Sequence, residues 1–274
     1  MSKHSKMVAL ALVVAMLATA AVMAGCSGGT ATTSTTAAPA KATVKTVTAG
    51  TVVAGSDTAF PPFESMNGNT AEGFDVDVVA AIAKEMGLKS EFKSYKFDTL
   101  IPTIVAGGKF DIIASGMTIN ADRKKQIDFS DPYIDSNQSI AVVNASTAKT
   151  AADLAGKQIG VQSGTTGQAW AKENIPGATL VPFDDTLSAF AALQAGKVDA
   201  VVNDLPVSAA IVKDTTRGLK IIQEIATGEQ YGFGVSKANP ELTKAINSAL
   251  AKIKASGEYD TIYMKWFGVA PSTK

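Results

Sequence analysis

A helix–glycine–strand unit occurs twice in this chain and constrains its fold more than any other feature. Residues 98–114 and 185–202 each begin with Asp-Thr-Leu, continue through a helical stretch to Gly-Lys-x-Asp, and end in a short apolar run. The leading Asp or Thr predicts a helix N-cap, and Gly108 and Gly196 predict the helix ends. Unless the similarity arose by chance, the chain contains two similarly built α/β lobes.

Further helices alternate with short β-branched runs. Helices are predicted over Phe74–Met86, Pro240–Ala255 and Glu258–Phe267, and buried strands near residues 51–54 and 158–161. Strands that alternate with helices predict mostly parallel sheets, whose ligands bind beyond the carboxyl ends of the strands. Two lobes that face each other through those loops would form a cleft.

The N-terminus has the pattern of an export signal. Lys3, His4 and Lys6 precede an apolar run over residues 7–23, and small residues then meet Cys26. The alternative is an uncleaved membrane anchor, because the run is long enough to span a bilayer. We expect residues 1–25 to be removed, and residues 26–46, rich in Ser, Thr and Ala, to form a flexible linker.

The composition excludes several classes of chemistry. The chain has 25 basic and 25 acidic side chains, so it shows no basic footprint for nucleic acid. Removal of residues 1–25 would take two lysines and the single His, leaving a net charge of −2. With one Cys, and that Cys next to the signal, we expect no disulfide framework, no Cys or His metal site, no cofactor, and no Ser–His or Cys nucleophile.

Polar and aromatic residues gather in the loops that would line the cleft. They offer a guanidinium, hydroxyls, backbone N–H groups, carboxylates and aromatic faces. A free α-amino acid needs this mixture: an Arg fork for its carboxylate, an acid for its ammonium, and apolar faces for its carbons. The candidates are Asp57, Phe60, Phe63, Phe97, Ser115, Gly116, Thr118, Arg123, Thr165, Thr166 and Asp204.

Each candidate taken alone has a plainer interpretation. The polar run around Arg123 is typical of a solvated turn, and Asp204 before Leu-Pro is as typical of a helix cap. Asp57 could be a turn residue, and isolated Phe residues are more often core. The run 163–167 could be a simple strand–helix turn or could present N–H groups to an anion.

Taken together, the motifs resemble a known family over about residues 50–268. The specific stretches include Gly-Ser-Asp-Thr-Ala-Phe-Pro-Pro-Phe-Glu (55–64), Gly-Phe-Asp-Val-Asp (73–77), Gly-Met-Thr-Ile with Arg123 (116–123), Ile-Asp-Phe-Ser-Asp-Pro-Tyr (127–133), Gly-Glu-Tyr (257–259) and Lys-Trp-Phe-Gly (265–268). The chain is similar to the polar amino-acid-binding proteins of bacterial ABC importers, solute-binding family 3. The resemblance implies a two-lobed α/β fold of the periplasmic-binding-protein type 2, joined by two hinge strands.

The resemblance also implies a role for each matching position. Asp204 and the Gly116 carbonyl would hold the α-ammonium, and Arg123, Thr118 and Thr166 the α-carboxylate. Phe60 and Phe97 would enclose the side chain, and Asp57 and Gln162 would lie at its end. The full set of ligand-binding residues implied is Asp57, Phe60, Phe97, Ala114, Ser115, Gly116, Thr118, Arg123, Gln162, Thr165, Thr166 and Asp204.

The same resemblance implies boundaries for the two lobes, a membrane anchor and protein partners. Lobe 1 would comprise 47–137 plus 232–270, and lobe 2 would comprise 138–231 with the hinge strands. Cys26 would carry a lipid that anchors a monomer outside the cytoplasm, in the periplasm or on the outer surface, beside its permease subunits. Met23 departs from the usual Leu of the lipoprotein signal.

Glutamine-binding proteins are the most similar members by motif, but two positions differ. Gln162 and Asn203 stand where those proteins often carry Lys and His. We expect Asp57 with Gln162 to favour a neutral amide or a cationic side chain over a carboxylate, so a glutamine-like or basic amino acid is predicted. The alternatives are a cyclohexadienyl or arogenate-type dehydratase using Asp57 or Glu64, an amino-acid sensor module, and a surface adhesin.

Overall fold

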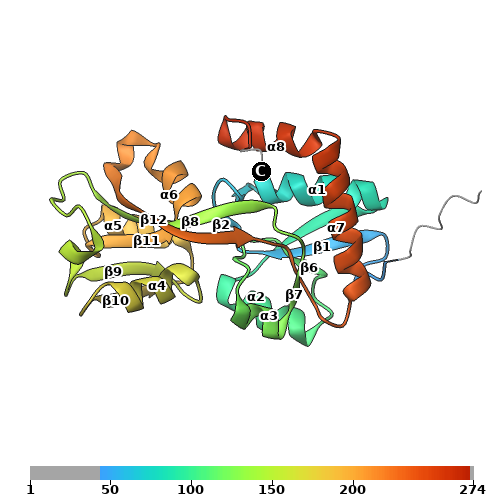
Figure 1. Cartoon of the computed structure of the whole chain (residues 1–274), viewed down its shortest axis with the longest axis horizontal. Helices are drawn as coiled ribbons and strands as arrows, with labels where there is room; N and C mark the ends of the chain where they lie inside the picture. The colour runs from blue at the N-terminus through green and yellow to red at the C-terminus, as the bar shows by residue number, and fades with distance from the viewer. Residues whose placement is uncertain (1–43, 272–274) are drawn as a thin grey trace, which may run out of the picture. The chain divides into compact units, whose positions relative to one another are not determined.

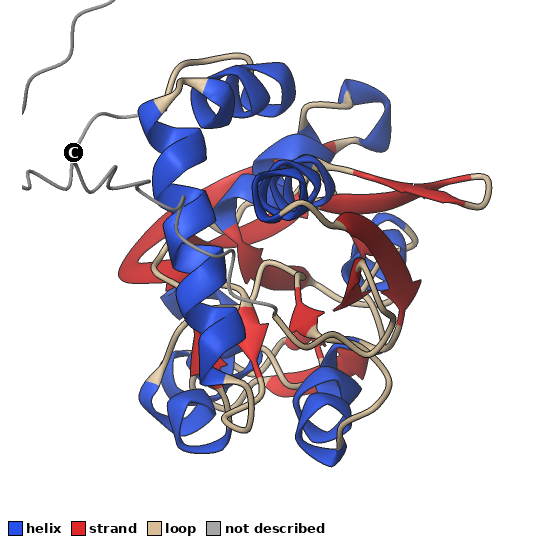
Figure 2. Ribbon diagram, turned by 90° about the vertical axis from the view of Figure 1, so that its right-hand side faces the viewer, coloured by secondary structure: helices blue, strands red, loops and turns tan. Residues whose placement is uncertain are grey.

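The computed structural model describes residues 44–271, which contain two five-stranded sheets and one three-stranded sheet. We call the lobe built on the first sheet lobe 1 and the lobe built on the second sheet lobe 2. In Figure 2 many of the strands lie between helices, and a pair of strands joined by a turn projects at the upper right. The two-lobed α/β fold is the predicted one. The expected signal, linker and lipidated Cys26 lie almost entirely outside the described residues, and only 44–46 of the linker are included.

The sheet of lobe 1 has a parallel centre and an antiparallel edge. β1 pairs in parallel with β5 and β6, whereas β13 runs antiparallel to β6 and β7. The strand order is β5 (Lys89–Ser94), β1 (Thr51–Ser56), β6 (Ile112–Ile113), β13 (Gly234–Val235), β7 (Asp128–Phe129). The chain therefore returns to lobe 1 after it has built lobe 2.

The sheet of lobe 2 repeats this plan. β9 pairs in parallel with β10 and β11, whereas β8 runs antiparallel to β11 and β12. The order is β10 (Thr179–Phe183), β9 (Gln158–Gln162), β11 (Ala200–Asp204), β8 (Ile134–Val143), β12 (Leu219–Tyr231). The prediction of mostly parallel sheets is thus only half right, because the long strands β8 and β12 and the short strand β13 run against their neighbours.

The helices fall close to the predicted ranges. α1, α7 and α8 coincide with the predicted helices, and a small sheet of β2 (Ala59–Phe60), β3 (Glu64–Asn67) and β4 (Thr70–Glu72) was not expected. The helices are α1 (Phe74–Met86), α2 (Phe97–Ala106), α3 (Ala121–Gln126), α4 (Thr166–Asn174), α5 (Thr186–Gln194), α6 (Leu205–Val212), α7 (Pro240–Ala255) and α8 (Glu258–Phe267), with 3₁₀ turns η1 (Ala151–Leu154) and η2 (Thr215–Arg217).

The two copies of the repeated unit begin differently. In α5, Asp185 is the N-cap, and its carboxylate accepts the Ser188 N–H at 2.7 Å, as predicted. In α2 the predicted cap is wrong, since Lys96 is the N-cap without a side-chain bond and Asp98 lies in the first turn. An Asp there still stabilises the helix through the dipole. The side chain of Phe97 is buried at this helix start.

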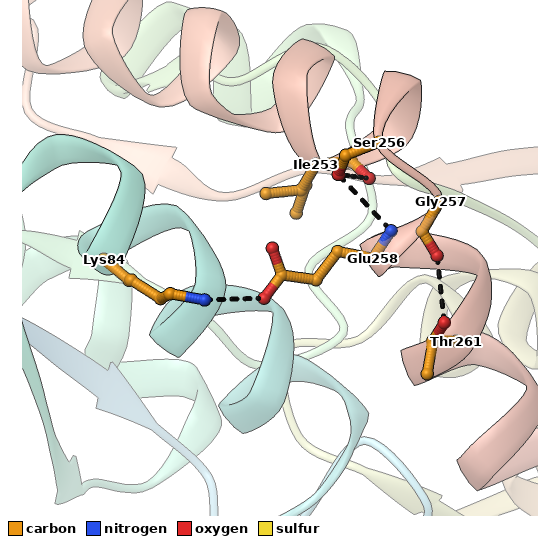
Figure 3. A network of polar contacts seen from close by, with 6 residues as sticks. All are labelled: Lys84, Ile253, Ser256, Gly257, Glu258 and Thr261. Carbon is orange, nitrogen blue, oxygen red and sulfur yellow. Dashed lines mark hydrogen bonds and ion pairs between the residues drawn. The ribbon is translucent and has the colours of Figure 1, made fainter.

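The turn between α7 and α8 folds the C-terminal segment back onto lobe 1 (Figure 3). Ser256 Oγ donates to the Ile253 carbonyl at 3.2 Å and accepts the Glu258 N–H at 3.4 Å. Gly257 has φ of 80°, a left-handed conformation that favours glycine. Lys84 Nζ of α1 lies 3.4 Å from Glu258 Oε1. Because this ion pair is exposed, it contributes about 0–1 kcal/mol, and packing holds α8 in place.

An aromatic cluster connects α1, α8 and the strands that lead to lobe 2. Phe74, the first residue of α1, packs edge-on against Phe267 at 5.1 Å between ring centroids and against Tyr259 at 5.8 Å. Phe63 meets Tyr231 of β12 at 5.2 Å. These rings are largely buried, and each buried ring of this size contributes roughly 1.5–3 kcal/mol to folding. The core of lobe 1 therefore extends to the strand that carries the chain between the lobes.

β8 and β12 lie side by side along their length (Figure 1). Tyr231 at the end of β12 also bridges to Thr118 of lobe 1, and Gly232 N–H donates to the Met117 carbonyl at 3.1 Å. The two long strands thus reach the loops of lobe 1. No helix among residues 44–271 is both long enough and apolar enough to cross a membrane.

Candidate functional site

The site is built first from the loop that follows β1. Asp57 comes directly after this strand, and its backbone N–H donates to Ser115 Oγ at 2.9 Å. Ser115 Oγ in turn donates to Glu64 Oε1 at 2.9 Å. Glu64 is fully buried. By accepting one hydrogen bond and donating another, the Ser115 hydroxyl links the loop after β1 to the first residue of β3.

A second buried carboxylate supports the next residue of the same turn. Asp75 Oδ2 accepts the Gly116 N–H at 3.1 Å, and the Tyr133 hydroxyl donates to both Asp75 oxygens at 2.8 Å. Burial raises the pKa of Asp75 to about 7. Burial and the neighbouring carboxylates of Asp75 and Asp57 raise the pKa of Glu64 well above its usual range.

Gly116 is required at the centre of this turn. Its φ is 48°, and a Cβ there would lie 2.7 Å from Cε1 of Phe60. Phe60 is nearly buried, and its ring lies 6.1 Å from the ring of Phe63, a core residue. The ring of Phe60 therefore lies close to Gly116 and leaves no room for a side chain there. Ala114, one position earlier, is buried and donates its N–H to the Gly55 carbonyl at 3.1 Å.

Arg123 is buried, not a solvated turn residue. It lies in α3, whose N-cap Asn120 accepts the Arg123 N–H at 2.9 Å. Its Nη1 donates to the Thr118 carbonyl at 2.8 Å, and its Cζ lies 5.3 Å from the centroid of the Phe97 ring. Burial lowers the pKa of Arg123, while Asp204 and Glu229 act in the opposite direction. A stacked guanidinium with free N–H groups suits a carboxylate.

Arg123 also reaches lobe 2. Its Nη2 donates to the Gly164 carbonyl at 3.1 Å, in the loop between β9 and α4. Thr165 is the N-cap of α4, and its hydroxyl accepts the Gln168 N–H at 3.1 Å. Thr166 is the first residue of this nine-residue helix. The loop 163–167 is therefore a capped helix start that faces the guanidinium.

Gln162 and Asp57 join the lobes at another point. Gln162 Nε2 donates to Asp57 Oδ2 and, at 3.2 Å, to the Asp184 carbonyl. Gln162 Oε1 accepts from the Thr186 hydroxyl at 2.9 Å, which also lies 3.1 Å from Asn203 Oδ1. Burial raises the pKa of Asp57 to about 6, although the bond from Gln162 opposes that shift.

Asp204 does not use its side chain as a helix cap. It is the N-cap residue of α6, but its carboxylate accepts from Gln138 Nε2 at 2.6 Å and from the Tyr231 hydroxyl. Gln138 and Tyr231 belong to β8 and β12. Burial raises the pKa of Asp204 to about 6, and Arg123 opposes the rise. Asp204 and Arg123 are thus a buried carboxylate and a buried guanidinium that come from different lobes and interact electrostatically.

Beside Asp57 the surface is hollowed. A pocket of about 440 Å³ is lined by both lobes, including Ser94 and Lys96 from lobe 1 and Asp184 and Asp185 from lobe 2. Lys96 Nζ and Asp184 Oδ2 are 2.6 Å apart at its rim. The candidate residues therefore run from Arg123 and Asp204 at one end to Asp57, Gln162 and this pocket at the other.

The predicted site residues lie on loops or element ends of the two lobes, apart from Arg123, which lies within α3, and Phe63, which belongs to the core. The sequence analysis gave no ligand-binding role to several buried or partly buried polar groups around them, and the signal for three was present, because Glu64, Asp75 and Tyr133 belong to the quoted motifs. The missed residues are Glu64, Asp75, Tyr133, Gln138, Glu229 and Tyr231. Among residues 44–271 no group of His, Cys, Asp and Glu could hold a metal ion.

Comparison with known proteins defines the class. Residues 52–269 match the model of the bacterial extracellular solute-binding proteins, family 3, and the chain belongs to this family. It is 37% identical over 219 residues to the ABC transporter arginine-binding protein 1 of Escherichia coli, covering 78% of this chain and 89% of that protein.

Solved structures agree with that assignment. An ancestral arginine-binding protein bound to arginine is 45% identical, with a TM-score of 0.77 over 80% of this chain and 99% of the other. The structure of an ancestral arginine-binding protein bound to glutamine is 44% identical, again with a TM-score of 0.77, over 81% of this chain and 100% of the other.

Proposed function

We propose that this protein is the substrate-binding component of an ABC importer that captures a polar or basic L-amino acid between its lobes. Family membership and the arginine- and glutamine-bound relatives support this function. The observation that carries it is the electrostatic interaction between Arg123 and Asp204. Both are buried, they come from different lobes, and each acts on the pKa of the other.

The two charges match the two ends of a zwitterion. Asp204 with the Gly116 carbonyl holds the α-ammonium, and Arg123 with Thr118 and Thr166 holds the α-carboxylate. In the described structure Arg123 Nη2 instead donates to the Gly164 carbonyl. A ligand carboxylate replaces that neutral acceptor with an ionised one, which makes a stronger hydrogen bond.

The other residues fit the rest of such a ligand. Phe60 and Phe97 enclose the aliphatic carbons, with Ala114, Ser115 and Thr165 forming the adjoining backbone wall. Asp57 and Gln162 meet the end of the side chain. A carboxylate next to an amide accepts an amide or guanidinium donor and repels a ligand carboxylate. We therefore assign a glutamine-like or basic ligand and exclude glutamate.

Binding closes the lobes about β8 and β12, near residues 136–142 and 228–233. The contacts Gln162–Asp57 and Arg123–Gly164 cross between lobes, so they exist only in the closed arrangement. A ligand that adds contacts in that arrangement shifts the population toward it. The permease subunits recognise the closed protein, a monomer that the lipid on Cys26 anchors outside the cytoplasm. The dehydratase alternative is not favoured, because the relatives reported above are named as binding proteins.

A thermal-shift screen of the twenty amino acids tests this function. Ligand binding to the folded state alone raises the melting temperature. We expect stabilisation by L-arginine or L-glutamine and none by L-glutamate. Failure of every amino acid to stabilise the protein contradicts the proposed function, and stabilisation by L-glutamate above all others contradicts the assigned specificity.

A further inference from the structure

The register of the two long strands changes beside the site. Ile225 of β12 pairs with Gln138 of β8, but Glu229, four residues on, pairs with Ser136, only two residues back. Two extra residues of β12 therefore bulge from the ladder, where Gly228 has φ of 65° and donates its N–H to Asn137 Oδ1 at 3.2 Å. Bulges of this kind re-aim side chains near functional sites.

The side chain that follows this bulge contacts the amino-acid site. Glu229 Oε2 accepts from Gln138 Nε2 at 2.8 Å and from the Thr166 hydroxyl at 3.1 Å. Gln138 Nε2 also donates to Asp204 Oδ1 at 2.6 Å. An amide nitrogen has two hydrogens, which match the two carboxylates. Gln138 thereby bridges Glu229 to the residue expected to bind the ammonium.

The orientation of Gln138 follows from its surroundings. Exchanging its amide oxygen and nitrogen would place an acceptor against two carboxylates, so the nitrogen must face them. Its Oε1 is buried without a hydrogen-bond partner among the described residues and lies against Gly167, where a Cβ would come within 2.8 Å. An unpaired buried acceptor costs about 1–3 kcal/mol. Because Gln138 keeps this orientation despite that cost, we infer that its hydrogen bonds to the two carboxylates hold the side chain in place.

Glu229 also adds a charge that a zwitterion does not require. Arg123 and Asp204 already balance the two ends of an amino acid, and Glu229 acts on both of them. Asp204 otherwise faces Arg123 of α3, the Tyr231 hydroxyl of β12 and the amide of Gln138. Burial keeps the tyrosine neutral by raising its pKa well above the usual value. Glu229 is therefore the additional negative charge acting on Asp204.

We propose that Glu229 is a positioning residue of the amino-acid site, which acts through Gln138 on Asp204 and directly on Thr166 and makes the ammonium end more negative. This inference rests on the proposed function. In this proposal the bulge in β12 contributes to ligand affinity. It places the Glu229 carboxylate next to Thr166 and, through Gln138, next to Asp204.

The test compares Glu229→Gln with Glu224→Gln by calorimetric titration with L-arginine and L-glutamine between pH 5 and 8. Glu224 lies on the same strand and is exposed, so its replacement removes the same charge without the contacts. We expect Glu229→Gln to weaken binding about tenfold at pH 7.5, because charge-assisted bonds become neutral ones. The melting temperature without ligand should match that of Glu224→Gln.

The pH profile separates positioning from a general structural effect. Removing the Glu229 charge lowers the pKa of Asp204, so the loss of affinity in acid must move to lower pH in Glu229→Gln and stay in place in Glu224→Gln. If the wild type binds amino acids and both variants keep its affinity and profile, this inference alone is overturned. If the wild type binds none of the twenty amino acids, the proposed function fails and the inference with it.

Discussion

At the scale of single residues, buried carboxyl groups shape this molecule. Glu64 and Asp75 lie beneath the Ser115–Gly116 turn, and Asp57 lies at the same edge of the sheet. Burial raises the pKa of each of the three, because a low-dielectric interior disfavours the ionised form. Glu64 and Asp75 therefore hold the turn that would contact a ligand, although neither is assigned a contact with the ligand itself.

Asp75→Asn should change how stability depends on pH. The pKa of Asp75 is about 7 in the folded protein and 3.8 as an ordinary Asp, so the folded state binds more protons between these values. Its contribution is fully present below pH 3.8 and is lost as the pH rises through 7. The free energy of unfolding, measured with denaturant, should fall more over this pH range for the wild type than for Asp75→Asn. Equal slopes would show that Asp75 is ionised throughout.

Affinity for the ligand should fall in acid, and more steeply for arginine. Asp204 and Asp57 have pKa values of about 6, and each binds a cation only when ionised. L-glutamine needs ionised Asp204 alone, whereas L-arginine needs both carboxylates. Below pH 6 affinity should drop about tenfold per pH unit for each group that must lose a proton. If affinity for the two amino acids depends on pH in the same way, Asp57 does not bind the end of the ligand side chain.

At the scale of elements, close backbone approaches fix the site loops. Gly116→Ala places a methyl group 2.7 Å from the Phe60 ring in a left-handed conformation. Gly108→Ala is a matched control, because Gly108 also has positive φ, at 79°, but meets no atom within 4 Å. Both variants carry the backbone cost of about 1–3 kcal/mol, and only Gly116→Ala should also displace Phe60 and weaken binding. Equal affinities in the two variants would contradict this role for the turn.

Much of the element plan could be predicted from the sequence, for physical reasons. The apolar stripe of residues 240–255 predicts α7, and Gly87 predicts the end of α1. Both signals are local in the sequence, because helix periodicity and helix caps involve residues close together in the chain. The direction of β8 and β12 could not be predicted, because long-range pairing decides it. The cap of α2 was missed because Phe97 is buried at the position that starts the helix.

The site was predictable only in part. Asp57 of a loop and Arg123 of α3 have charged side chains that the sequence identifies directly, although the charged run around Arg123 does not predict that Arg123 is buried. The contacts of Gln138 and Glu229 depend on a bulge in β12, and no local sequence pattern predicts this two-residue change of register. Which residues support a site from behind is therefore a property of the tertiary structure.

At the scale of the whole molecule, the lobes are joined by hydrogen bonds of buried side chains, such as Gln162–Asp57 and Arg123–Gly164, and by an exposed ion pair. Lys96 and Asp184 form an ion pair at the rim, but both side chains are mostly exposed. Solvent screens such an exposed pair, so Lys96→Ala should change the dissociation rate of L-arginine less than about fivefold in stopped-flow measurements. A larger change would make the rim, rather than the buried residues, the main element that holds the lobes closed.

The central claim is that Arg123 and Asp204 grip the two ends of one amino acid from opposite lobes. Calorimetric titration of the wild type, Arg123→Ala and Asp204→Ala with the amino acid that stabilises the protein best tests it directly. We expect one bound molecule per wild-type chain and a loss of about 2–5 kcal/mol of binding free energy in each variant, because a buried charge loses its partner. Wild-type affinity in either variant would contradict it.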